Sequence, residues 1–172
     1  QGWTMADKDK SFAERYIVKP GKSFDLSKCD PRAANGFGDK ENAKADTFRD
    51  AQAIDALQNR LYAEGKRALL VVLQGIDCAG KDGTVRAVFN HCGPIGVKVQ
   101  PFKAPTPDEL AQDYLWRVHR ACPPRGYIGI FNRSYYEETL VVRVHPEYLE
   151  KQRLPRELAT DRIWDHRFED IR

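Results

Sequence analysis

The chain has 172 residues, of which 41% are hydrophobic and 31% are charged, a balance typical of one globular domain and not of a disordered or fibrous chain. Its net charge of +3 suits a polyanionic ligand, although no block of like charges is present. The longest apolar run covers only residues 68–73, whereas a membrane-spanning helix needs about 20 residues. No charged-then-apolar leader opens the chain, so we expect a cytoplasmic protein without a membrane partner.

Residues 1–4 precede the only methionine, Met5, and we expect them to be a cloning remnant ahead of the native start. The four cysteines include no C-x-x-C pair and no nearby histidine pair. This spacing argues against a zinc site or a disulfide framework and favours free thiols in a reducing compartment.

Residues 5–44 combine charge, glycine and proline without periodicity, so we expect an irregular N-terminal arm there. Residues 45–172 are predicted to form an α/β domain. A helix is predicted from Thr47, which can form a variant capping box with Asp50, to a stop at Gly65.

Three strands are predicted at 68–74, 97–102 and 127–131, with the first buried on both faces of a parallel sheet. One connecting helix is predicted after Gly83. A second begins at a capping box formed by Thr106 and Glu109 and continues to residue 122. This alternation predicts right-handed parallel crossovers and a layered α/β fold.

A glycine-rich motif, G-x-x-x-x-G-K, stands between the first predicted strand and the following helix. Its backbone N–H groups and the helix dipole favour an anion, and a lysine at its end adds a mobile charge. The predicted phosphate-binding residues here are Gly75, Ala79, Gly80, Lys81, Asp82 and Gly83. The alternative is a strand-to-helix turn that happens to contain glycines.

Asp77 lies inside this motif, where its carboxylate would repel a phosphate unless a cation stood between them. We therefore predict that Asp77 binds Mg²⁺, which prefers one or two carboxylates together with phosphate oxygens. The alternative is that Asp77 caps the following helix. Asp82 is either a second metal contact or an acid that favours the helix dipole.

The third predicted strand is followed by Asn132 and Arg133, which should face the glycine-rich loop because ligands collect beyond the carboxyl ends of parallel strands. Arg133 can stabilise a transferring phosphoryl group. The alternative is that Arg133 is simply a surface arginine. Asn132 and Glu137 are the candidates for contacting a nucleotide, and Glu137 is also a possible aid to Asp77 in metal binding.

Five ordered motifs resemble the family-2 polyphosphate kinases, which are P-loop kinases that move phosphate between inorganic polyphosphate and nucleotides. The motifs are G-x-D-x-x-G-K-D-G at 75–83, F-K-A-P at 102–105, L-W-R at 115–117, F-N-R-S-Y-Y-E-E at 131–138 and V-V-R-V-H-P at 141–146. The resemblance implies that Asp77, Lys81 and Arg133 are catalytic. Lys103 and Arg117 also match family positions, where they would form a basic track for phosphates. The alternative is that either residue is a solvated charge.

The resemblance implies a P-loop kinase-like three-layer sandwich and Mg²⁺-dependent in-line transfer between polyphosphate and AMP or ADP, giving ADP or ATP. Many family members have Asp in place of Asn132, and the form found here resembles the subgroup that accepts AMP as well as ADP. The alternatives are an ATP-dependent nucleoside monophosphate kinase and a phosphate-binding module without turnover. A nucleic-acid partner is not expected, because aromatic and basic residues are not interleaved on one sheet face.

We also expect a homo-oligomer and a sheet that is incomplete at the C-terminus, because family members continue beyond the position of Arg172 with further strands and a basic lid. An apolar stripe near the end of the chain is expected to be exposed here and covered by another chain, and these residues alone are expected to show weak kinase activity. The stripe consists of Ile163, Trp164, Phe168 and Ile171.

Overall fold

The computed structural model describes residues 14, 16–21, 23–30, 32–33 and 39–172. The chain divides into two units, Gln1–Asp46 and Thr47–Arg172, which are described separately. In the first unit, the short 3-10 helix η1 spans Leu26–Lys28. Asp25 caps it by accepting a hydrogen bond from the backbone N–H of Ser27 at 3.1 Å.

Helix α2 spans Lys40–Glu64 and begins earlier than predicted. Its first turn is capped by Asp39, whose Oδ1 accepts a hydrogen bond from the backbone N–H of Asn42 at 2.8 Å. The predicted start at Thr47 is therefore wrong, and residues 40–44 are helical instead of part of an irregular arm. The predicted end is confirmed, because Gly65 follows the helix with a φ of +63°.

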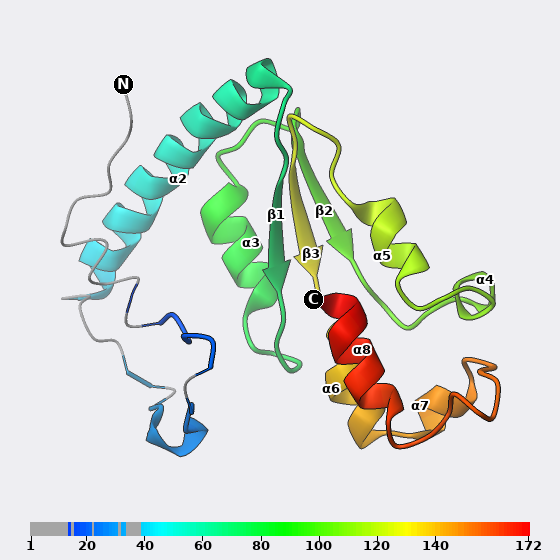
Figure 1. Ribbon diagram of the computed structural model, residues 1–172. Helices are drawn as coiled ribbons and strands as arrows, with labels where there is room; N and C mark the ends of the chain where they lie inside the picture. The colour runs from blue at the N-terminus through cyan, green and yellow to red at the C-terminus, as the bar shows by residue number, and fades with distance from the viewer. Residues whose placement is uncertain (1–13, 15, 22, 31, 34–38) are drawn as a thin grey trace. The chain divides into compact units, whose positions relative to one another are not determined.

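The sheet of the second unit contains three parallel strands in the order β1-β3-β2, and all three strands match the sequence prediction. Strand β1 spans Leu69–Leu73, β2 spans Val97–Pro101 and β3 spans Ile128–Asn132. In register, the last residue of β3 lies between the last residues of β1 and β2. The three arrowheads point to the same end, where the loop after β1 lies (Figure 1). The fold is α/β with a parallel sheet, as predicted.

Burial differs sharply between the central strand and the edge strand β1. In β3, Ile130 and Phe131 are 0% exposed, and Phe131 forms a core cluster with Phe102 and Val118. In β1, Leu69 is 49% exposed. The prediction that this first strand is buried on both faces is therefore wrong for the described residues, because every residue of β1 is exposed or half-buried.

The connections carry helices α3 (Lys81–Phe89), α4 (Pro107–Leu110) and α5 (Trp116–Ala121). The predicted capping box is confirmed: Thr106 Oγ1 accepts from Glu109 N at 3.3 Å, and Glu109 accepts from Thr106 N at 2.8 Å. The single helix predicted up to residue 122 is instead two helices. The side chain of Asp113 accepts from Leu115 N at 2.9 Å, and this local bond starts a new turn in place of continuing the first helix.

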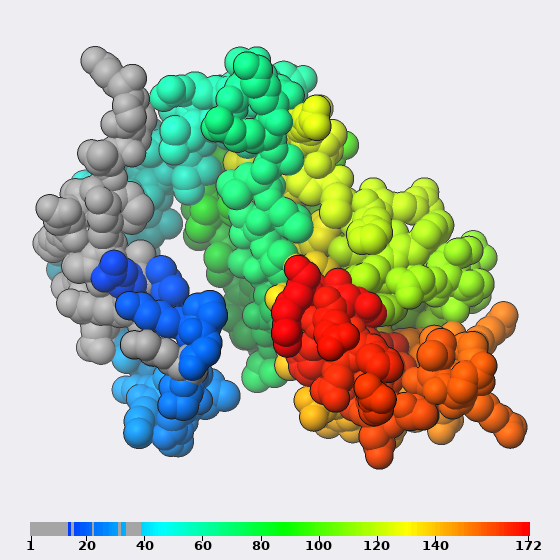
Figure 2. Space-filling model, in the orientation of Figure 1, coloured from blue at the N-terminus to red at the C-terminus, as the bar shows by residue number. Residues whose placement is uncertain are grey.

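Helices α6 (Glu137–Val144), α7 (Glu147–Glu150) and α8 (Ile163–Ile171) form the C-terminal part of the unit. Helix α8 contacts α6, and the space-filling view shows the red C-terminal residues lying against the orange segment (Figure 2). Ile163 is 7% exposed, whereas Trp164, Phe168 and Ile171 are half-buried. The expectation of an exposed stripe is therefore wrong for Ile163, and the chain covers the other three residues only in part.

All four cysteines, Cys29, Cys78, Cys92 and Cys122, belong to the described residues and carry free thiols. Burial, together with the charge of Asp55, raises the pKa of the Cys92 thiol. None of the helices in the described part of the chain combines the length and apolar composition that crossing a bilayer requires.

Candidate functional site

The glycine-rich loop connects the end of β1 to the first turn of α3. Gly80 occupies the N-cap position with a φ of +88°, a left-handed conformation that glycine adopts without strain. Lys81 folds back across the loop, and its Nζ donates to the carbonyl oxygens of Gly75 at 2.7 Å and Ile76 at 2.8 Å. The ammonium group thus lies inside the loop, beside the helix N-terminus, where an anion is favoured.

A cavity of about 650 Å³ opens over this loop at the carboxyl end of the sheet. It brings together most of the predicted site residues, including both predicted catalytic cations. The lining residues among those predicted are Asp77, Ala79, Gly80, Lys81, Asp82, Gly83, Lys103, Asn132 and Arg133. Gly75, Arg117 and Glu137 do not line it. We refer to this space as the loop cavity.

Arg133 follows β3 with a φ of +65°, a conformation that is uncommon for a residue with a side chain and that concentrates at functional sites. Its backbone N–H donates to the carbonyl of Leu73 at 3.0 Å, which fixes the residue beside the end of β1. Its guanidinium forms an ion pair with Asp77, and Nη1 lies 3.8 Å from Oε2 of Glu137. One arginine therefore links the glycine-rich loop to the start of α6.

The two acids of the loop region have different partners. Asp77 is 80% exposed and pairs with Arg133, while Asp82 accepts a hydrogen bond from the side-chain amide of Asn132. The end of β3 thus supplies a partner for both carboxylates. The helix-cap alternative for Asp77 has no support among the side-chain hydrogen bonds at the start of α3, where Gly80 is the N-cap.

Sequence reasoning missed a hydrogen-bond network beside the loop cavity. The side-chain amide of Gln74 donates to Glu137 Oε1 at 2.7 Å, and its carbonyl oxygen accepts from the Ser134 hydroxyl at 3.0 Å. The same hydroxyl oxygen accepts from Tyr136 N at 3.1 Å. The available signal was a polar residue placed between an apolar strand and the first glycine of the loop.

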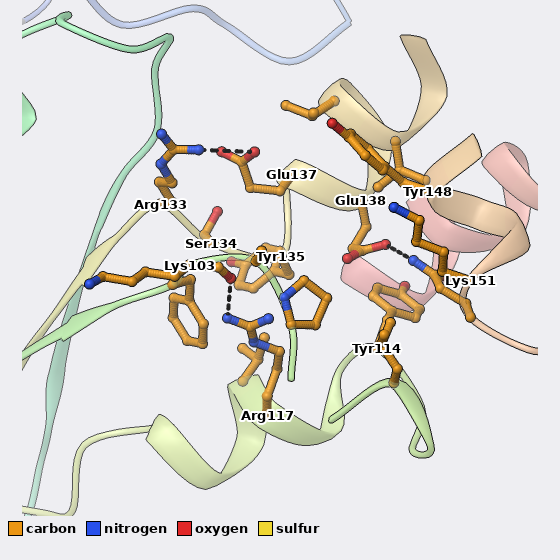
Figure 3. Close-up of a pocket in the computed structure, with 18 residues that line it drawn as sticks. Lys103, Tyr114, Arg117, Arg133, Ser134, Tyr135, Glu137, Glu138, Tyr148 and Lys151 are labelled. Atoms are coloured by element: carbon orange, nitrogen blue, oxygen red, sulfur yellow. Dashed lines mark hydrogen bonds and ion pairs between the residues drawn. The ribbon is translucent and has the colours of Figure 1, made fainter. Parts of the chain in front are cut away.

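A second cavity of about 370 Å³ adjoins the loop cavity, and the two share Phe102, Lys103, Ala104 and Arg133. Figure 3 shows Arg133 and Lys103 on one side of this space and Tyr114, Tyr148 and Lys151 on the other. Its lining mixes aromatic rings with charged groups, including Arg117, Glu137 and Glu138. We refer to it as the side cavity.

Arg117 lies in the side cavity and not with the loop residues. Its Nη2 donates to the backbone carbonyl of Lys103 at 2.8 Å, its Nε lies 3.5 Å from Glu109, and its guanidinium stacks over the ring of Phe102 (Figure 3). The side chain is only 15% exposed. Arg117 holds the backbone that carries Lys103, while the Lys103 side chain extends away from it.

The donor set of the loop cavity suits Mg²⁺ in the manner of phosphate-transfer sites. Among the described residues, no three histidine, cysteine or acidic side chains are close enough to hold a metal by themselves. Magnesium in such sites needs one or two carboxylates, with substrate phosphates and water completing the octahedron. Asp77, exposed at the cavity wall, supplies a carboxylate of this kind.

Comparison with known proteins identifies the family of the chain. The sequence profile of the family Polyphosphate kinase 2 (PPK2) matches residues 37–166. The chain belongs to the polyphosphate kinase 2 family. A relative from Meiothermus ruber named AMP/ADP-polyphosphate phosphotransferase is 42% identical over 160 residues, which make up 92% of this chain and 56% of the relative. A relative from Rhodopseudomonas palustris named ADP-polyphosphate phosphotransferase is 39% identical over 160 residues, 92% of this chain and 55% of the relative.

Solved structures give the same result for the fold. The crystal structure of polyphosphate kinase 2 from Arthrobacter aurescens TC1 superimposes with a TM-score of 0.80 at 36% identity, and covers 92% of this chain and 53% of the other chain. The P-loop kinase-like fold that the sequence predicted is therefore confirmed. The chain spans about half the length of the curated relatives it matches.

Proposed function

We propose that this member of the polyphosphate kinase 2 family transfers a phosphoryl group between inorganic polyphosphate and AMP or ADP, with Mg²⁺ as cofactor. The observation that carries the proposal is the meeting of Lys81 and Arg133 over one cavity of about 650 Å³ at the carboxyl end of the sheet. Two cations and the backbone N–H groups of a helix N-terminus suit a polyphosphorylated ligand. The names of the relatives from Meiothermus ruber and Rhodopseudomonas palustris support the same substrates.

Each catalytic residue has a role that follows from its position. Lys81 exchanges its bonds to the loop carbonyls for bonds to phosphate oxygens, which brings positive charge to the group that the loop cradles. Arg133 offers a planar fork of donors to the transferring phosphoryl group, where charge spreads over the equatorial oxygens. Phosphoryl transfer needs this positioning and charge neutralisation more than it needs a strong base.

Asp77 is the residue that would hold Mg²⁺, and the ion would neutralise phosphate charge when bound. Asp77 and Arg133 neutralise each other across the cavity. A bound cation and phosphate offer both side chains stronger partners. The ion pair thus keeps the two groups in place until substrate arrives.

The side cavity is the proposed place of the nucleoside. It opens from the loop cavity at Arg133 and is lined by aromatic rings, including Tyr114 and Tyr148, which suit a planar base. Glu137 lines the side cavity and Asn132 lines the loop cavity, so the two predicted nucleotide contacts lie on either side of this opening.

A donor and acceptor panel tests the proposal. Polyphosphates of graded length are offered to AMP and ADP, and ATP is offered to AMP, each with and without Mg²⁺, using the full-length protein and its Lys81→Ala variant. We expect polyphosphate-dependent formation of ADP or ATP that requires Mg²⁺ and Lys81. Transfer from ATP alone would identify a nucleoside monophosphate kinase, and binding without turnover would identify a phosphate-binding module.

The cellular location and the assembly state are separate predictions. We expect a cytoplasmic homo-oligomer that binds neither membranes nor nucleic acid. Light scattering after size-exclusion chromatography measures the mass of the assembly, and a monomer would contradict the prediction.

A further inference from the structure

Gln74 connects the strand before the glycine-rich loop to the segment after β3. Its side chain bonds two residues that lie far along the chain: Ser134 at 3.0 Å and Glu137 at 2.7 Å. The surroundings hold this bridge firmly, because Ser134 is 4% exposed and the Glu137 side chain is 20% exposed. A hydrogen bond to a half-buried carboxylate is among the stronger kinds in proteins.

The bridge needs a side-chain amide at position 74. The amide nitrogen donates to the carboxylate of Glu137, while the amide oxygen accepts the proton of the Ser134 hydroxyl. A carboxylate at this position could accept from Ser134 but would repel Glu137. A methionine of similar length would serve neither partner.

The bridge leads to the predicted catalytic arginine. The carboxylate of Glu137 that Gln74 holds also faces Arg133, with 3.8 Å between Oε2 and Nη1. The other side of the guanidinium reaches Asp77 in the glycine-rich loop. The direction of the guanidinium therefore depends on two carboxylates, one of which is oriented by Gln74.

We infer that Gln74 is a positioning residue for phosphoryl transfer: it orients Glu137, which in turn aims Arg133 into the loop cavity. This inference rests on the proposed function. It assigns Gln74 no contact with substrate. A loss of alignment on the order of 1 Å at a reacting group can cost about 100-fold in rate, which sets the scale of the expected effect.

The first test is Gln74→Glu in the full-length protein, assayed for kcat and KM with polyphosphate and ADP or AMP over a range of pH. The new carboxylate faces that of Glu137, so kcat should fall on the order of 10- to 100-fold at alkaline pH. Two adjacent carboxylates share a proton as the pH falls, so the defect should shrink toward acidic pH. The KM for polyphosphate should change less than kcat.

The matched control is Gln100→Glu, the same change near the end of the neighbouring strand β2. Gln100 is exposed, and its side chain donates only to the carbonyl of Pro101, at 3.2 Å, among the described residues. This variant adds the same charge to the same end of the sheet. We expect its pH profile to follow that of the unmodified protein.

The second test does not depend on activity. The reciprocal variant, Gln74→Glu combined with Glu137→Gln, restores one amide donor and one carboxylate acceptor. Thermal unfolding of both single variants and the double variant measures the coupling. Each single change should lower Tm by several degrees at pH 8, and the double change should recover most of that loss.

The outcomes separate this inference from the proposed function. An active unmodified protein whose Gln74→Glu variant has the same pH profile, or additive Tm losses in the double variant, would overturn the inference alone. An unmodified protein that is inactive across the whole donor panel would overturn the proposed function and the catalytic part of the inference with it. A pH-dependent kcat defect together with reciprocal rescue supports both.

Discussion

Arg167 of α8 places its guanidinium against the carboxylate of Glu138 in α6, with 3.1 Å between Nη1 and Oε2. The arginine side chain is 3% exposed, and its guanidinium stacks over the rings of Tyr114 and Trp164. Burial lowers its pKa, while the carboxylate of Glu138 opposes that shift. Because Nη1 also donates to the backbone carbonyl of Glu138 at 3.1 Å, one side chain fastens α8 to α6.

We expect Arg167→Met to destabilise the protein by about 3–5 kcal/mol, the usual cost of leaving one buried charge of a pair without its partner. Combining it with Glu138→Gln should cost less than Arg167→Met alone, because no isolated carboxylate then remains. Urea denaturation of the unmodified protein and the variants measures these differences.

The control for this prediction is Arg156→Met, which removes an exposed arginine near α8. Exposed substitutions usually change stability by no more than about 0.5 kcal/mol. A cost below about 1 kcal/mol for Arg167→Met would contradict the structural role of the buried pair.

Gln58 gives a prediction of a substitution that should stabilise the protein, in contrast to Arg167→Met. Its side chain is buried on α2, the residue is 1% exposed, and neither amide atom has a hydrogen-bond partner in the described structure. Gly96, with a φ of +89°, lies so close that an added Cβ would approach Gln58 Nε2 to 2.0 Å. A buried polar group without a partner costs about 1–3 kcal/mol, so we expect Gln58→Met to raise the free energy of unfolding by about this amount.

The comparison for Gln58 is Gln52→Met on the same helix, where the side chain is exposed. This substitution should leave the urea midpoint nearly unchanged. If Gln58→Met lowers the midpoint, then the amide is satisfied in solution by an ordered water or a partner, and the prediction is wrong.

Local signals in the sequence predicted most of the fold. The three strands, the capping box at Thr106 and the glycine-rich loop depend on residues a few positions apart, so pattern and turn chemistry were sufficient. The errors at helix ends have the same local origin. Asp39 supplies a cap ahead of Thr47, and Asp113 offers the backbone a bond that competes with the helix.

The candidate site was only partly predictable, because its side chains meet across long stretches of chain. Gln74 is 60 residues from Ser134 and 63 from Glu137, and no periodicity links these positions. Arg117 shows the same limit. Its bond to the carbonyl of Lys103 is a pairing that only tertiary packing creates, and its predicted phosphate contact stays a prediction.

Asp77 gives a prediction about metal dependence. Its exposed carboxylate lines the loop cavity and pairs with Arg133. We expect Asp77→Asn to raise the Mg²⁺ concentration needed for half-maximal transfer by roughly tenfold or more, because a neutral amide is a weaker ligand for a hard cation. A Mg²⁺ titration of activity measures this shift, with Asp108→Asn, an exposed acid in the first turn of α4, as the control. An unchanged titration would remove Asp77 from the metal site.

Lys81 gives a prediction that separates catalysis from folding. In the structure its Nζ donates only to carbonyls of its own loop, at 2.7 and 2.8 Å, among the described residues. Because these bonds stay within one loop, Lys81→Ala should change the unfolding midpoint little. Turnover should fall by roughly two to four orders of magnitude, because the variant lacks a group that stabilises charge in the transition state. The steady-state rate and circular dichroism of the same samples are the measurements. Activity within about threefold of the unmodified protein would contradict a catalytic role for the lysine.

Tyr114 gives a prediction about alkaline stability. Burial raises its pKa above the ordinary value, and the charge of Asp170, whose Oδ2 accepts the phenol proton at 3.3 Å, adds to the increase. In the unfolded chain the phenol ionises near pH 10, while in the folded protein it stays neutral. The unfolded state therefore binds fewer protons above pH 10, so stability falls as the pH rises, by no more than roughly 1.4 kcal/mol per pH unit from this group. At neutral pH, the free energy of unfolding of the Tyr114→Phe variant should be about 1 kcal/mol lower than that of the unmodified protein, because the hydrogen bond is lost. Between pH 10 and 11.5, it should decline less steeply than that of the unmodified protein.

Urea midpoints measured at intervals from pH 7 to pH 11.5 test this sign directly. Tyr148→Phe is the control, because Tyr148 is 42% exposed and its ring packs beside His145 and Lys151 at the surface. The curve of the Tyr114→Phe variant should approach that of the unmodified protein as the pH rises, because only the unmodified protein loses the contribution of a phenol held neutral. Parallel curves for the two proteins up to pH 11.5 would show that the hydroxyl of Tyr114 ionises as freely in the folded state as in the unfolded chain, which would contradict its burial against Asp170.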